Sequence, residues 1–233
     1  MMLLSSHPLF LKAIGMTKRP FFSIITTTYN RAGLLVRALD SLMAQTEIDW
    51  EAIVVNDGST DETHQIVWSY LKKDSRMKYV FQPNQGFICG KNTGIGLARG
   101  RYLTFLDSDD AYAPTHLSTR KTILEEDPEL DLLHGGVRII GPEFVPDAND
   151  PGKNIHLSEC AISGTFFIKK AAMEALERFK GNALTTDADF MIRAIKKELK
   201  IVKVDIPTYI YHRDVESSVT LDLLRNNENK IQP

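Results

Sequence analysis

The chain has 233 residues, of which 43% are hydrophobic, and its formal net charge is -2. This length and composition favour one large domain with a substantial buried core. Proteins that neutralise several nucleic-acid phosphates carry a basic surface, and this sequence has no basic excess, so no nucleic-acid partner is predicted. A diphosphate ligand would therefore need a metal cation to balance its charge.

The chain has two cysteines, Cys89 and Cys160, and no CxxC pair. They are interpreted as free thiols in a reducing compartment, and neither a zinc site nor a disulfide framework is predicted.

Residues 1–20 are predicted to form an N-terminal extension. The segment MMLLSSHPLFLKAIG has no basic residue before its apolar run, and Pro8 interrupts that run. No window supplies the roughly 20 apolar residues of a spanning helix, so a cytoplasmic protein is predicted. The alternative is a peripheral association with the inner face of the membrane through the apolar side chains Leu3, Leu4, Leu9, Phe10 and Leu11.

From Phe21 onward, strand-like and helix-like segments alternate, which is typical of a mostly parallel sheet covered by helices. The first connecting helix is predicted to start from an N-cap at Asn30, and the second from a capping box of Ser59 and Glu62. The third is interrupted by glycines and covers 86–99. Strands rich in β-branched and aromatic residues are predicted at 22–27, 52–57, 77–81 and 101–107.

The second half of the chain is less regular, and 21–233 is interpreted as one domain. Its first part, 21–114, is predicted to bind a nucleotide, and 115–233 to form an acceptor face. The predicted elements of that second part are a helix over 114–126, a strand over 130–140, a long loop over 141–159, a strand over 163–168, a helix over 169–179, a helix from Thr186 and Asp187, and extended structure over 200–213.

Polar side chains follow three of the predicted strands. The first strand leads into Thr26–Asn30, the second into Asn56 and Asp57, and the fourth into Asp107–Asp110. Ligands of open α/β sheets lie at the carboxyl ends of the strands, so these segments predict a binding site at one sheet edge. The alternative is that each single aspartate only caps the helix that follows.

The acidic cluster of Asp107, Ser108 and Asp109 is the strongest single feature. Carboxylates this close repel one another unless a cation lies between them. Mg²⁺ and Mn²⁺ prefer oxygen ligands and bridge protein carboxylates to substrate phosphates. The pattern therefore predicts a divalent metal site, with an acidic turn as the alternative.

Two other nucleotide sites are not indicated. A dinucleotide site needs a glycine-rich turn after the first strand, where this chain has TTTYNRAG. A P-loop is absent, because the glycines of GFICGKNTGIG lie between the third and fourth strands and are not followed by GK[ST].

Four segments together resemble the family 2 glycosyltransferases: SIITTTYNR, IVVNDGSTDET, NQGFICGKNTGIGLARGRYLTFLDSDD and, more weakly, LTTDADFMIRAIKK. The strong part spans about 21–114. The resemblance implies an α/β GT-A fold, in which a Rossmann-like, mostly parallel central sheet is flanked by helices. It also implies a nucleotide-sugar-binding half at 21–114, an acceptor-binding half at 115–233 and an inverting transfer from a nucleotide-diphosphate sugar.

By the same resemblance, Tyr29 lies near the base, and Asp57 accepts a hydrogen bond from it, as in uridine-using members. Asn56 stands where an acidic residue is usual. Lys91 stands where arginine is usual, and lysine keeps the positive charge but lacks the planar guanidinium with its fork of donors. The alternative for Lys91 is a solvated helix residue. The implied nucleotide-binding residues are Thr27, Tyr29, Asp57, Asn84, Gly86, Lys91 and Asp107.

The resemblance also implies a metal site and a catalytic base. Asp109 is predicted to bind Mn²⁺ or Mg²⁺ directly, with Asp107 as a metal or ribose ligand and His212 as a further metal ligand. Asp187 corresponds to the catalytic base of a Glu-Asp motif, although Thr186 replaces the glutamate. The alternative for Asp187 is an N-cap or first-turn acid favoured by the helix dipole.

The predicted acceptor is a hydroxyl of a saccharide, a lipid-linked saccharide or a protein, as in polysaccharide or glycoconjugate biosynthesis. The alternative function is a catalytically degenerate nucleotide-sugar-binding module, motivated by Asn56, Lys91 and Thr186. A phosphohydrolase or a sugar nucleotidyltransferase fits the motifs poorly. The sequence leaves open the sugar, the base, the acceptor and the oligomeric state.

Overall fold

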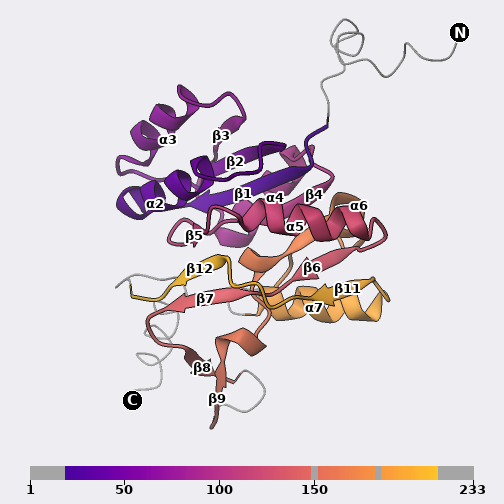
Figure 1. The fold of residues 1–233 in the computed structure, drawn as a ribbon. Helices are drawn as coiled ribbons and strands as arrows, with labels where there is room; N and C mark the ends of the chain where they lie inside the picture. The colour runs from indigo at the N-terminus through magenta and orange to yellow at the C-terminus, as the bar shows by residue number, and fades with distance from the viewer. Residues whose placement is uncertain (1–18, 148–151, 182–184, 215–233) are drawn as a thin grey trace, which may run out of the picture.

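The computed structural model describes residues 19–147, 152–181 and 185–214, so nearly all of the predicted N-terminal extension lies outside the described residues. Within these ranges a seven-stranded sheet has the order β11-β6-β10-β4-β1-β2-β3 (Figure 1). β10 runs antiparallel to both of its neighbours, and the other pairs are parallel, as the sequence predicts. The strands are β1 (Phe22–Thr28), β2 (Trp50–Asn56), β3 (Met77–Phe81), β4 (Tyr102–Phe105), β6 (Leu132–His134), β10 (Phe167–Lys169) and β11 (Ile201–Lys203).

Helices cover both faces of this sheet. All seven residues of β1 are buried: Phe22 and Ile24 belong to one hydrophobic cluster and Ile25 to another. Burial on both faces explains why the central strands are continuous apolar runs. The first cluster includes side chains of α2 (Ala32–Met43), α3 (Thr63–Leu71) and α5 (His116–Glu126), and the second those of α4 (Phe87–Leu97), α6 (Lys170–Ala175) and α7 (Thr186–Lys196).

The predicted strand at 130–140 is two strands in two sheets. Gly135 and Gly136 separate β6 from β7 and have φ angles of 93° and 77°. A Cβ atom at Gly136 would lie 2.1 Å from the carbonyl oxygen of Ile206, so the turn requires glycine there. The second sheet has the order β5-β12-β7 and consists of β5 (Ala111–Tyr112), β12 (Tyr209–His212) and β7 (Val137–Ile140).

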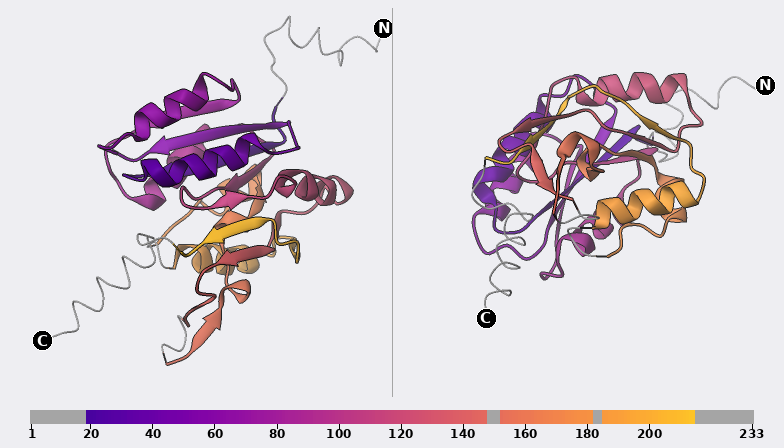
Figure 2. Two further views of the ribbon diagram at one scale, coloured as in Figure 1. Left: turned by 60° about the vertical axis from the view of Figure 1, so that its left-hand side comes forward. Right: turned by 90° about the horizontal axis from the view of Figure 1, so that it is seen from below.

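The predicted loop at 141–159 contains regular structure, so that prediction was wrong in part. β8 (Phe144–Pro146) and β9 (Asn154–His156) pair as an antiparallel hairpin, which projects from the body of the protein (Figure 2). The 3₁₀ turn η1 (Leu157–Glu159) follows it. Proline, glycine and asparagine are typical of loops. They hid the hairpin because its two strands have only three residues each.

Both predicted helix caps were wrong. Asn30 has a φ of 50° and precedes the N-cap residue of α2, which is Arg31. Glu62 is itself the N-cap residue of α3 and makes no side-chain capping bond. Asp61 supplies the caps instead: its carboxylate accepts hydrogen bonds from the amide of Ala32 (2.9 Å) and that of Thr63 (3.1 Å). One side chain thus accepts a hydrogen bond from the first backbone amide of each of two helices.

Two further boundaries differ from the sequence prediction. The segment 163–168 begins as the 3₁₀ turn η2 (Ser163–Thr165), and the helix predicted over 169–179 ends at Ala175. Glu177 and Arg178 have φ angles of 57° and 63°, which is incompatible with a continuing right-handed helix.

α4 packs unusually close to β1 because two of its residues have no side chain. A Cβ atom on Gly90 would lie 2.4 Å from Cγ2 of Thr27, and one on Gly94 would lie 2.5 Å from Cγ2 of Ile25. The glycines that weaken the helical pattern in the sequence therefore let α4 lie directly on the strand that leads into the acidic site.

Gly94→Ala is expected to lower the free energy of unfolding by about 1–2 kcal/mol, measured by chemical denaturation. Alanine gains about 1 kcal/mol of helix propensity, but overpacking of a core costs about 1–3 kcal/mol. Ile25 is 1% exposed and has no free space to move into. The matched control is Gly33→Ala in α2, because a Cβ there meets nothing within 4 Å. Equal effects of the two substitutions would contradict the close-packing argument.

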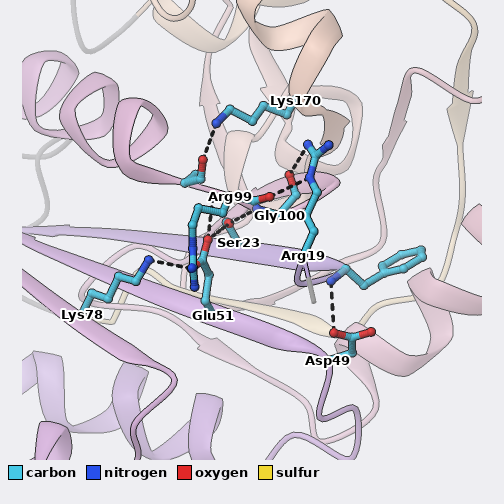
Figure 3. A network of polar contacts seen from close by, with 10 residues as sticks. Arg19, Ser23, Asp49, Glu51, Lys78, Arg99, Gly100 and Lys170 are labelled. Atoms are coloured by element: carbon cyan, nitrogen blue, oxygen red, sulfur yellow. Dashed lines mark hydrogen bonds and ion pairs between the residues drawn. The ribbon is translucent and has the colours of Figure 1, made fainter. Parts of the chain in front are cut away.

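A polar network joins the sheet to the turn between α4 and β4, at the start of the strands (Figure 3). The Glu51 carboxylate, which is 3% exposed, accepts hydrogen bonds from Ser23 Oγ (2.7 Å), the Arg99 amide (2.6 Å) and Lys78 Nζ (2.8 Å). Ser23 Oγ in turn accepts one from the Gly100 amide. Burial raises the pKa of Glu51, but these hydrogen bonds outweigh burial and lower the pKa below its ordinary value.

Glu51→Gln is expected to lower the free energy of unfolding at pH 7 by about 1–3 kcal/mol. An unfolded glutamate has a pKa of about 4.3. Since the folded pKa lies below that value, Glu51 stabilises the fold above about pH 4.3 and stops doing so as the pH falls through the folded pKa. The difference between the two proteins should therefore shrink on acidification. Glu62→Gln, at an exposed position, is the control, and a pH-independent difference would contradict the assignment.

Candidate active site

Four side chains from separate elements meet beyond the carboxyl end of β4. Lys91 of α4 is 1% exposed, and its Nζ lies 2.7 Å from Ser163 Oγ and 3.3 Å from Asp107 Oδ1. The backbone amide of Ser163 donates a hydrogen bond of 2.7 Å to Asp187 Oδ2. The structure thus brings together three residues predicted from the sequence, through a fourth, Ser163, that was missed.

Lys91 lies in an aromatic environment rather than in solvent. Its ammonium is 4.3 Å from the ring centroid of Phe87, 5.3 Å from that of Phe105 and 5.6 Å from that of Phe179. Such contacts stabilise a cation where water is excluded. The alternative of a solvated helix residue is therefore wrong, and a compact ammonium suits this narrow position.

Asp187 carries a carboxylate oxygen without a partner. Oδ2 accepts the Ser163 hydrogen bond, while Oδ1 is buried and has no hydrogen-bond partner among the described residues. Burial raises the pKa of Asp187; the Lys91 cation and the Ser163 amide oppose the rise, Asp107 adds to it, and the net pKa is raised. The N-cap position of α7 belongs to Thr185, which makes no side-chain capping bond. Asp187 therefore lies in the first turn of α7, as the alternative has it, but its carboxylate accepts from Ser163 and does not cap the helix.

Asp109 and Asp110 each have their own partners. Asp109 Oδ2 pairs with an Arg31 nitrogen at 2.5 Å, and the Asp109 carbonyl accepts a short hydrogen bond from Arg37. Burial raises the pKa of Asp109, Arg31 opposes the rise, and Asp107 adds to it, so the net pKa is raised.

Asp110 joins the acidic segment to β12. Its carboxylate accepts hydrogen bonds from the Tyr209 hydroxyl (2.6 Å) and the His212 amide (2.8 Å). Burial, together with Asp109 and Asp107, raises its pKa well above the ordinary value. The predicted metal ligand His212 is therefore placed beside the acidic segment by its backbone, while its Nδ1 lies 3.1 Å from Asp214 Oδ1.

Within the described ranges, no three histidine, cysteine, aspartate or glutamate side chains gather as a metal-binding group. Asp107, Asp109 and His212 therefore do not form a three-ligand site by themselves. A site built from one or two carboxylates and substrate phosphates is common for Mg²⁺. The Asp107 side chain, at 29% exposed, and that of Asp109 fit such a site.

Asp57 holds the segment that leads into α4. Oδ1 accepts hydrogen bonds from Gln82 Nε2 (2.7 Å) and the Gln85 amide (3.0 Å), and Oδ2 accepts one from the Gly86 amide (2.8 Å). Gly86 has a φ of 89° and is the N-cap residue of α4. Asn84 is exposed, and its Oδ1 also accepts from the Gly86 amide. Three predicted nucleotide-binding residues thus form one connected turn.

The side-chain amide of Asn56, which stands where an acidic residue is usual in the family, makes two hydrogen bonds. Its Oδ1 accepts a hydrogen bond from the Ser59 amide (2.8 Å), which fixes the orientation of the side-chain amide. Nδ2 then donates to the Tyr79 hydroxyl (2.9 Å), which also lies 3.3 Å from His64 Nδ1. An aspartate at this position could not donate to Tyr79 as the amide does.

Thr27 and Tyr29 lie at the end of β1. Thr27 is 9% exposed, and its Oγ1 is buried without a hydrogen-bond partner among the described residues. Tyr29 is 47% exposed. A half-exposed ring just beyond β1 can cover a flat ligand, whereas Thr27 lies beneath Gly90 of α4.

Sequence reasoning missed several residues of this site. Arg31 belongs to the quoted segment SIITTTYNR, and Asp110 to the acidic cluster, so both were visible as motif members without a role. Ser163 lies far from these motifs, and Gln82 lies two residues before the third of them; only the folded chain reveals their contacts with Asp187 and Asp57.

Among residues 19–147, 152–181 and 185–214, no helix is both long and apolar enough to cross a bilayer.

The family described as glycosyl transferase family 2 matches residues 23–181. The uncharacterized glycosyltransferase EpsJ of Bacillus subtilis is 39% identical over 117 residues, which are 50% of this chain and 34% of that protein. Glycosyltransferase GlyA of Streptococcus pneumoniae is 38% identical over 97 residues, 42% of this chain and 14% of that protein. The matched part of the chain spans about a third or less of these relatives.

Two solved structures share the fold. S. aureus TarS 1–349, in complex with UDP-GlcNAc, has a TM-score of 0.72 at 23% identity, over 84% of this chain and 59% of that one. The mannosyltransferase PcManGT from Pyrobaculum calidifontis, in complex with GDP-Man and Mn²⁺, has a TM-score of 0.67 at 19% identity, over 87% and 59%. These likenesses confirm the predicted GT-A fold.

Proposed function

Because this chain belongs to glycosyl transferase family 2, we propose that it transfers a sugar from a nucleotide-diphosphate donor to an acceptor hydroxyl, with inversion at the anomeric carbon. The observation that carries this proposal is the Asp187 carboxylate, whose Oδ1 is buried and has no partner among the described residues. A buried oxygen without a donor is costly unless a ligand supplies one. The hydroxyl of an acceptor is such a donor.

Asp187 acts as the general base in this proposal. The acceptor hydroxyl donates its hydrogen bond to Oδ1, and the carboxylate takes the proton as the oxygen attacks the anomeric carbon. Burial raises the pKa of Asp187, which brings it closer to the pH at which a base works efficiently. Ser163 holds the other oxygen and so fixes the direction of the carboxylate.

The donor lies on the side of Asp107 and Lys91. A divalent cation, Mn²⁺ or Mg²⁺, held by Asp107 and Asp109 would act as a Lewis acid on the leaving diphosphate. Lys91 Nζ lies 3.3 Å from Asp107 Oδ1 and adds to the positive potential there. Tyr29 would cover the base, and the turn held by Asp57 would border it.

A UDP-sugar is the favoured donor. Asp57 corresponds to the base-binding residue of uridine-using family members, and TarS is described with UDP-GlcNAc. A GDP-sugar is the alternative, because PcManGT is described with GDP-Man. The proposed acceptor is a saccharide, lipid-linked or protein hydroxyl bound by 115–233, with 21–114 binding the donor.

Titration calorimetry with UDP and GDP, with and without Mn²⁺, tests the donor site. We expect metal-dependent binding of one nucleotide, weakened at least about fivefold in Asp109→Ala. Glu125→Ala on the exposed side of α5 is the control and should bind as the wild type does. Failure of both nucleotides to bind would contradict the donor-site assignment.

Asp187→Asn separates catalysis from binding. The variant should bind the donor nucleotide normally and release nucleoside diphosphate from the donor sugar about 10²–10⁴-fold more slowly. Wild-type turnover should fall as the pH drops through the raised pKa of Asp187. Because a raised carboxyl pKa destabilises the fold at neutral pH, the asparagine variant should be at least as stable as the wild type. Unchanged turnover in this variant would rule out Asp187 as the base.

The alternative function is the nucleotide-sugar-binding module without transfer activity. Thr186, which replaces the usual glutamate, is 2% exposed, and its hydroxyl donates to the Lys180 carbonyl, so it has a structural role. Donor binding without turnover by the wild type, with saccharide and lipid-linked acceptors supplied, would favour this module.

A further inference from the structure

The side chain of Arg31 lies where the proposed metal would bind. β1 and β4 are parallel neighbours, so Arg31, just beyond β1, comes close to Asp109, just beyond β4. One guanidinium nitrogen lies 2.5 Å from Asp109 Oδ2, and the two side chains are 13% and 12% exposed. A partly buried ion pair of this kind is screened less by solvent than a surface pair.

This ion pair has no role in starting α2. The first amide of that helix, at Ala32, donates to Asp61 Oδ2, and Arg31 makes no side-chain capping bond. The other N–H groups of the Arg31 guanidinium make no hydrogen bond to any residue in the described part of the chain. An arginine carries five donors in a planar fork that suits phosphate as well as carboxylate. Among the described residues, Arg31 therefore has donors that no acceptor uses.

Each carboxylate of the acidic segment has its own partner within the protein. Asp107 pairs with Lys91, and Asp109 with Arg31, while Asp110 accepts from a hydroxyl and a backbone amide. A divalent cation at Asp109 Oδ2 would displace Arg31, and one at Oδ1 would share the charge of the carboxylate with it. The metal and the guanidinium therefore compete for the same carboxylate.

We propose that Arg31 is the internal counter-ion of Asp109, which keeps the divalent cation weakly bound until a nucleoside diphosphate arrives and accepts hydrogen bonds from the displaced guanidinium. This inference rests on the proposed donor site. The metal and the nucleotide would each strengthen the binding of the other, because the diphosphate provides both new metal ligands and a new partner for Arg31. An ion pair that loses its acceptor without such a replacement leaves a partly buried cation unpaired.

The test is to measure Mn²⁺ binding through the electron paramagnetic resonance signal of free Mn²⁺, with and without UDP or GDP. Without nucleotide, Arg31→Gln is expected to bind Mn²⁺ at least about fivefold more tightly than the wild type. The increase in Mn²⁺ affinity caused by the nucleotide should be at least about fivefold smaller in the variant. Arg31→Lys keeps the charge and should keep the low affinity for Mn²⁺ alone.

Arg37→Gln is the matched control. Arg37 contacts the same residue, but it donates to the backbone carbonyl of Asp109 and not to the carboxylate. This variant should not bind Mn²⁺ alone more tightly than the wild type. Circular dichroism melting curves of all variants show whether each one folds.

Two results would overturn the inference: an Mn²⁺ affinity of Arg31→Gln that equals or falls below that of the wild type, or no measurable Mn²⁺ binding by either protein. A different result would count against the donor site alone. If Arg31→Gln binds Mn²⁺ more tightly but none of the proteins binds a nucleotide, the competition between Arg31 and the metal is supported and the donor site is wrong.

Discussion

The buried ammonium of Lys91 connects the two halves of the site. It lies between Asp107, which follows a strand of the first half, and Ser163, whose amide holds Asp187 of the second half. An unpaired ammonium in this position would carry a desolvation cost of several kcal/mol. The chain therefore has to bring β4, η2 and α7 to the same place. The close approach of α4 to β1, through Gly90 and Gly94, puts Lys91 at that depth.

Much of the fold could be predicted because it depends on local patterns. The strands at 22–28, 50–56 and 77–81 are hydrophobic runs with β-branched or aromatic residues, and the turns between them are polar. The carboxyl ends of parallel strands meet at one edge regardless of the details of packing. This is why the sequence alone predicts that Asp107 and Asp109 lie at that edge, just beyond β4.

The features that could not be predicted depend on contacts distant in sequence. Asp61 caps α2 across 29 residues, a contact that no local capping pattern contains. Gly135 and Gly136 divide one apolar run between two sheets because the backbone near Ile206 leaves no space for a side chain. Ser163 has no recognisable motif, and its role follows only from the packing of η2 against α7. Local patterns therefore predicted the elements but not their junctions.

The charges at the site give a physical reason for a metal in the proposed reaction. Asp107, Asp109 and Asp187 carry up to three negative charges, and Lys91 and Arg31 carry two positive ones. Asp110 lies in the same segment, and burial together with Asp109 and Asp107 raises its pKa well above the ordinary value. A nucleoside diphosphate adds further negative charge, which the two cations cannot offset while they remain paired with aspartates. A divalent cation would supply the missing positive charge and free one protein cation to bind a phosphate. The same pairing that stabilises these aspartates without a ligand thereby favours the simultaneous binding of metal and nucleotide.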